Sequence, residues 1–125
     1  MQEAEKIWMN GELVDWADAK VHVLSHGLHY GSSVFEGIRA YDAEGGTAVF
    51  RLADHLASLQ KSAAMYYMDV TYSRDALRSA VHRVLASNGL GACYIRPIVL
   101  RGYGEMGLFP LIAPVDVAIA AWPWG

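Results

Sequence analysis

At 125 residues, the chain is long enough for one domain, which would bury about two thirds of the surface that the unfolded chain exposes. Hydrophobic residues make up 54% of the chain and charged residues 18%, and a net charge of −3 without any basic run argues against a nucleic-acid partner or an anionic membrane. Because charged residues fall short of the ~25% of an ordinary soluble domain, we expect some apolar surface to pack against a partner.

The cysteine content and the first residues bear on the cellular location. A single cysteine, Cys93, precludes an intrachain disulfide and favours a reducing compartment. An inert buried thiol is favoured over a reactive one, since no basic residue adjoins Cys93. The polar, acidic start does not resemble a signal peptide, and no apolar run approaches the roughly 20 residues of a membrane span. We therefore expect a cytoplasmic protein.

The first fifty residues are dominated by strand patterns. Asn10-Gly11 best supplies the two positive φ angles of a tight hairpin turn, and a second turn is indicated by the glycines of residues 42–46. Val21–Val23 is expected to be a short extended piece. Strands are expected at residues 6–9, 12–14, 34–41 and 47–50.

The hydrophobic period lengthens after residue 51. Apolar residues at steps of four and three predict a helix over about residues 52–66. A second helix is expected to begin after Ser73, a plausible N-cap, and to end at Asn88-Gly89. The residues that define the face of the first helix are Leu52, Leu56, Leu59, Ala63 and Tyr66.

Two long runs of strand-forming residues complete the chain, at residues 92–100 and 115–122. Between them, residues 102–114 form a glycine- and proline-punctuated loop of a length that is commonly functional. Strands, then two consecutive helices, then strands predict an α+β fold in two layers, a mostly antiparallel sheet with both helices packed on one face. Without repeats or a linker, we expect one domain over residues 1–125.

Residues 23–41 form the stretch around which a site is expected. Glycine and serine breaks in its first half lead into an alternating second half. Gly37 would let the backbone approach a ligand closely. Tyr30, Phe35 and Arg39 would supply a hydroxyl, an apolar wall and a fixed positive charge.

The motif His29-Tyr30-Gly31-Ser32-Ser33-Val34-Phe35-Glu36-Gly37-Ile38-Arg39 resembles the N-terminal signature of the branched-chain amino-acid aminotransferases, class IV (fold-type IV) enzymes that use pyridoxal phosphate. Further motifs follow in that family's order: Ile7–Gly11, Ala19–Val23, Phe50-Arg51, Tyr94–Pro97 and Ala120–Gly125. The resemblance covers essentially the whole chain, but in the family it covers only the small N-terminal domain. It implies a parent enzyme that moves an amino group from leucine, isoleucine or valine to 2-oxoglutarate.

The resemblance also implies substrate-binding positions. An apolar wall would accept a branched side chain, and Arg39 and Arg96 would lie near substrate carboxylates. Phe35 and Tyr94 could equally be core aromatics. Tyr30, with Met106 and Leu108, resembles residues that reach into the neighbouring subunit's site. The full set is Tyr30, Phe35, Gly37, Arg39, Tyr94, Arg96, Met106, Leu108 and Trp124.

Cofactor binding is expected to be incomplete. Ser58 stands where the resemblance places an arginine that grips the cofactor phosphate, so a bidentate, charge-assisted contact would be lost. The family's Schiff-base lysine lies in a large C-terminal domain beyond residue 125, and Lys6, Lys20 and Lys61 are expected at the surface. We therefore expect that this chain alone binds no pyridoxal phosphate and has no transaminase activity.

A non-enzymatic function stays open beside this one. The chain could be a self-associating or binding module, because apolar surface is expected where a large domain would dock, and Ile112 extends an apolar run in the loop. Homo-oligomers are expected, and a complementary C-terminal domain is a further candidate partner.

A metal site is an alternative at His22, His26 and His29. A helix would align these three side chains as zinc ligands. The extended pattern of residues 21–23 and the presence of Gly27 argue against such a helix, so no metal site is predicted. His55 and His82 are expected on helices, at the surface or in hydrogen-bonded packing.

Overall fold

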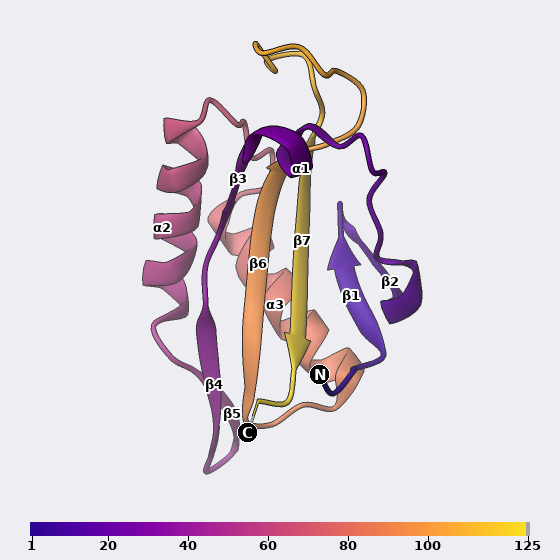
Figure 1. The fold of residues 1–125 in the computed structure, drawn as a ribbon. Coiled ribbons are helices and arrows are strands. Elements are labelled where there is room, and N and C mark those ends of the chain that lie inside the picture. The colour runs from indigo at the N-terminus through magenta and orange to yellow at the C-terminus, as the bar shows by residue number, and fades with distance from the viewer. Residues whose placement is uncertain (125) are drawn as a thin grey trace.

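The computed structural model describes residues 1–124, in which one seven-stranded sheet is backed by two long helices (Figure 1). Gly125, the last residue of the 120–125 motif, lies outside the described residues. The strands are β1 (Lys6–Met9), β2 (Glu12–Asp15), β3 (Ser33–Phe35), β4 (Ile38–Ala43), β5 (Gly46–Val49), β6 (Cys93–Arg101) and β7 (Val115–Trp122). The helices are the 3₁₀ turn η1 (Trp16–Asp18), α1 (His26–Tyr30), α2 (Leu52–Met65) and α3 (Arg74–Asn88).

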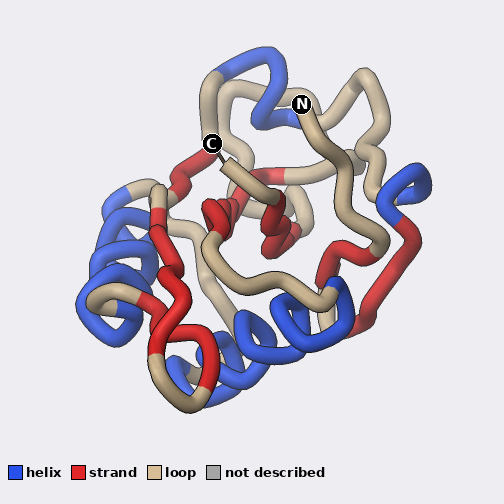
Figure 2. The backbone as a smooth tube through the Cα atoms, turned by 90° about the horizontal axis from the view of Figure 1, so that it is seen from below, coloured by secondary structure: helices blue, strands red, loops and turns tan. Residues whose placement is uncertain are grey.

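The sheet is antiparallel throughout the described strands. Its order is β2-β1-β7-β6-β4-β5, and β3 also pairs with β6. Both long helices lie on one side of the strands (Figure 2). The predicted α+β fold, a mostly antiparallel sheet with two helices on one face, is therefore confirmed.

The hydrophobic core lies between that face and the two helices. Alternation along β6 turns Ile95 and Val99 into the core, where both are fully buried. From α2, Leu56 and Leu59 are equally buried, as the predicted periodicity requires.

Local sequence signals set most element boundaries as predicted. Asn10 and Gly11 have φ angles of 49° and 96°, the positive values expected of the turn between β1 and β2. The Ser73 side chain accepts a hydrogen bond from the Ala76 amide at 3.0 Å and caps α3, and Gly89 ends α3 in the left-handed region.

The predicted strand at residues 34–41 is divided into β3 and β4. Both parts pair with β6 in the same register, which places residues 36 and 37 opposite Pro97 and Arg96. The Glu36 amide still donates to the Pro97 carbonyl oxygen at 3.2 Å. Pro97 has no N–H to return, so the ladder is interrupted there.

Gly27 is expected from the sequence to weaken a helix, yet it lies inside a short one, which does not extend to His22. Residues 26–30 form α1, which ends where the Gly31 amide donates to the Gly27 carbonyl oxygen. A Cβ on Gly27 would lie 3.3 Å from the Arg101 carbonyl oxygen and 3.4 Å from the Leu100 Cβ. Glycine therefore lets this helix lie directly against the end of β6.

Among residues 1–124, no helix combines the length and the apolar character needed to cross a membrane.

Leu56→Ala should destabilise the protein by about 2–5 kcal/mol, because it leaves a cavity against a well-packed core. The free energy of unfolding, measured by urea titration, checks this. Leu111→Ala is the matched control, since Leu111 is 64% exposed and Leu56 is 0% exposed, and its change should stay within about 0.5 kcal/mol. Equal losses for the two variants would contradict the assignment of the core.

Candidate functional site

Most of the predicted site residues lie on the sheet face opposite α2 and α3. Strand alternation turns Phe35, Arg39, Tyr94 and Arg96 towards this open face, since their sequence neighbours point into the core. The structure groups six residues here, which we call the open-face cluster: Phe35, Gly37, Arg39, Tyr94, Arg96 and Trp124.

Arg96 is the central cation of the open-face cluster. Its guanidinium carbon lies 4.1 Å from the centroid of the Phe35 ring and 5.2 Å from that of Tyr94. Nη2 donates to the Tyr94 hydroxyl at 2.9 Å, while the buried Nε has no partner. No carboxylate within residues 1–124 forms an ion pair with it. A guanidinium oriented by neutral groups in this way can accept an external carboxylate.

Tyr94 is packed among aromatic rings and over a glycine. Its ring centroid lies 4.8 Å from that of Trp124 and 5.1 Å from that of Trp122. A Cβ on Gly37 would collide with the Tyr94 hydroxyl and lie 3.1 Å from its Cζ. Glycine is therefore required at position 37 so that the Tyr94 hydroxyl can lie close to the backbone. Arg39 lies over the Trp124 ring at 5.9 Å.

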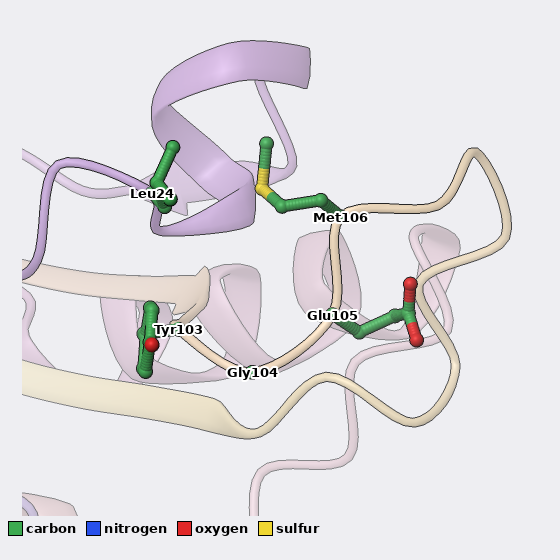
Figure 3. Close-up of a pocket in the computed structure, with 5 residues that line it drawn as sticks. All are labelled: Leu24, Tyr103, Gly104, Glu105 and Met106. Carbon is green, nitrogen blue, oxygen red and sulfur yellow. The ribbon is translucent and has the colours of Figure 1, made fainter.

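Tyr30, Met106 and Leu108 lie at the other end of β6, apart from the open-face cluster. The Tyr30 hydroxyl donates to the Met106 carbonyl oxygen at 3.0 Å, and Leu108 is 77% exposed. Figure 3 shows Met106 pointing from the loop towards α1, beside a shallow hollow of about 370 Å³. The hollow is lined by Leu24, Tyr103, Gly104, Glu105 and Met106.

Ser58 takes part in a polar cluster on α2. Its hydroxyl donates to Glu36 Oε2 at 3.0 Å, and His55 Nδ1 lies 2.8 Å from Glu36 Oε1. A phosphate placed at Ser58 would meet the Glu36 carboxylate, and the serine hydroxyl is already engaged. These residues do not fit the phosphate of pyridoxal phosphate.

The sequence did not single out Glu36 or Arg101 as important. Glu36 bridges two α2 side chains across the sheet edge, and Arg101 is buried at the end of β6. Arg101 carried one usable signal, a charge that follows the apolar run Pro97–Leu100 and adjoins a long loop.

The three histidines considered as metal ligands point to different partners. His22 Nδ1 accepts from the Leu24 amide, His29 Nε2 lies 2.8 Å from the Val23 carbonyl oxygen, and His26 contacts Ser32 and Gly107. No group of three or more His, Cys, Asp or Glu side chains in residues 1–124 is arranged to hold a metal ion.

The lysines and the cysteine have the environments expected from the sequence. Lys20 and Lys61 are exposed, and the hydrogen bond and charge of Asp15 raise the pKa of Lys6, which favours the protonated, non-nucleophilic amine. Burial, with a smaller contribution from Asp42, raises the pKa of the Cys93 thiol, as expected of an unreactive group.

Residues 33–125 match the family described as amino-transferase class IV. The chain belongs to the class IV aminotransferase family. It is 50% identical to the branched-chain-amino-acid aminotransferase of Escherichia coli (strain K12), over 99% of this chain and 40% of that protein. The resemblance drawn from the sequence motifs is therefore confirmed. The chain spans about 40% of the length of the curated relatives it matches.

Two solved structures of the T.th. branched-chain amino acid aminotransferase are also similar, each at 44% identity over 99% of this chain and 42% of that chain. One is complexed with 4-methylvaleric acid and has a TM-score of 0.96. The other is complexed with N-(5'-phosphopyridoxyl)-L-glutamate and has a TM-score of 0.95.

Gly37→Ala should destabilise the protein by about 1–3 kcal/mol, because the new methyl displaces the Tyr94 ring. Tyr94→Phe alone should cost about 0.5–1.5 kcal/mol, the loss of one hydrogen bond. In the double variant the removed hydroxyl makes room for the methyl, so the cost should be smaller than the sum of the two single costs. Urea unfolding of the four proteins measures the coupling, and additive costs would contradict the contact.

Proposed function

We propose that residues 1–125 form the substrate-side part of a branched-chain amino-acid aminotransferase. In the whole protein, the reaction would transfer the amino group of leucine, isoleucine or valine to 2-oxoglutarate, with pyridoxal phosphate as cofactor. The observation that carries this proposal is Arg96, a cation held by Phe35 and Tyr94 on an aromatic face with no carboxylate of residues 1–124 paired to it.

The open-face cluster has the two kinds of side chain that such substrates need. The rings of Phe35, Tyr94 and Trp124 form an apolar wall that can exclude water from a branched side chain. Arg96 and Arg39 offer guanidinium groups to carboxylates. The ligands named for the two T.th. structures, a branched carboxylic acid and a glutamate adduct, support both roles.

We assign no cofactor contact to Ser58, because its hydroxyl is bound to the Glu36 carboxylate. The cofactor would be held by parts of the protein other than this chain, and we expect residues 1–125 alone to bind none and to be inactive. Tyr30, Met106 and Leu108 would contact the site of a neighbouring subunit in a homo-oligomer, since they lie away from the open-face cluster. We also propose a cytoplasmic location.

Activity can be tested in a chimera that carries residues 1–125 in place of the matched part of the Escherichia coli relative. Arg96→Met should lower kcat/KM for 2-oxoglutarate at least ~30-fold, because truncating one partner of a buried charge pair costs about 2–5 kcal/mol. Arg83→Met, at an exposed position on α3, is the matched control and should have no effect. Steady-state kinetics give both values.

Two results would contradict the proposal. One is a chimera whose Arg96→Met variant is as active as the unmodified chimera. The other is turnover of leucine and 2-oxoglutarate by residues 1–125 alone, with added pyridoxal phosphate, well above a cofactor-only control.

A second candidate function is a self-associating module. The loop exposes large apolar side chains, and the open face has a mainly apolar hollow of about 280 Å³ where Ala118 and Ala120 leave room. The exposed loop residues are Leu108, Phe109, Leu111 and Ile112.

Light scattering should give the purified chain a mass above that of one copy, because these apolar surfaces would be covered in an assembly. Phe109→Asp should shift the mass towards the monomer. Phe50→Asp places the same charge on an exposed phenylalanine beside β5 and should leave the mass unchanged. A monomeric mass for the unmodified chain would count against this candidate.

A further inference from the structure

The loop of residues 102–114, at the top of Figure 1, is fastened by two buried polar side chains. His26 on α1 is 2% exposed, and Arg101 at the end of β6 is 4% exposed. Neither belongs to the open-face cluster. Both side chains contact main-chain carbonyl oxygens of the loop, so their hydrogen bonds constrain its backbone directly.

His26 fastens the middle of the loop to α1. Its Nε2 lies 2.9 Å from the Gly107 carbonyl oxygen, which can only accept, so Nε2 carries the hydrogen. In the neutral ring, Nδ1 then accepts from the Ser32 hydroxyl at 2.7 Å. The ring packs 4.4 Å from that of Tyr30, whose hydroxyl donates to the Met106 carbonyl oxygen. Two successive loop carbonyls are thus bound to one short helix.

Arg101 fastens the far end of the loop to the turn that follows α2. Nη1 donates to the Ala113 carbonyl oxygen at 2.8 Å, and Nη2 donates to the Tyr67 carbonyl oxygen at 2.6 Å. The Gly102 amide donates to the Pro114 carbonyl oxygen at 2.7 Å, and this hydrogen bond joins the two ends of the loop. Between the two fastenings, Leu108 is left 77% exposed.

We propose that His26 and Arg101 are positioning residues, which hold this loop in one conformation and present Met106 and Leu108 beside Tyr30 to another subunit. A loop that is ordered before assembly loses less conformational entropy on contact. What Met106 and Leu108 meet rests on the proposed function. The fastening of the loop does not, because it depends on contacts within one chain.

Hydrogen exchange of backbone amides, followed by NMR on the full chain, tests the fastening. The Gly107 and Ala113 amides are hydrogen-bonded within the loop, to Glu105 Oε1 and to the Pro110 carbonyl oxygen, and serve as reporters. His26→Leu removes the donor to Gly107 and should speed exchange of both reporters at least tenfold. The amides of β6 and β7 should change less than threefold.

Two further variants separate positioning from general destabilisation. His26→Gln keeps an N–H donor within reach of the Gly107 carbonyl oxygen and should restore most of the protection. His82→Leu makes the same change at an exposed position on α3 and should leave the loop unaffected.

Arg101→Met should speed exchange at Ala113 more than at Gly107. Unchanged loop exchange in His26→Leu, or an equal rise throughout the sheet, would overturn the proposal. Neither result would bear on Arg96, whose role is measured separately in the chimera.

Discussion

Strand β6 is the constraint on which both sides of the molecule depend. It pairs with β7 along most of its length and with both β3 and β4, so segments distant in sequence meet on it. Because side chains alternate, a single residue step separates the core from the open face. A one-residue slip would carry Arg96 into the core, so the burial of Ile95 and Val99 fixes the register of the open-face cluster.

The sheet also separates opposite charges. Arg96 lies on the open face among neutral groups that orient its charge without neutralising it. Glu36 lies on the α2 side, where His55 and Ser58 hold its carboxylate. An anionic ligand is therefore favoured on the open face and disfavoured at Ser58.

The elements predictable from sequence are those determined by neighbouring residues. The caps of α3 at Ser73 and Gly89, and the turn at Asn10-Gly11, depend on local backbone preferences. The short helix α1 depends instead on contacts with β6 and with the loop, which no local pattern contains. No local pattern contains the hydrogen bond between Ser58 and Glu36 either, because it forms only when α2 folds over the edge of the sheet. The grouping of Phe35, Arg39, Tyr94 and Arg96 follows from period-two alternation in their strands, whereas Gly37 and Trp124 lie outside the strands and were named from the motif resemblance.

Two unusual positions of the sheet, Glu36 and Gly37, are related through Pro97 on the neighbouring strand. The register places Glu36 opposite Pro97 and Gly37 opposite Arg96. Because Pro97 returns no N–H, the ladder opens there, yet the register is the same on both sides of the gap, so alternation continues. The Glu36 side chain therefore stays on the α2 side, while Gly37 leaves room on the open face for the Tyr94 hydroxyl that holds Arg96. The geometry of the open-face cluster thus follows from β6 and its partners alone. Position 58 lies on α2, on the other side of the sheet, so a change of residue there can leave the open-face cluster undisturbed.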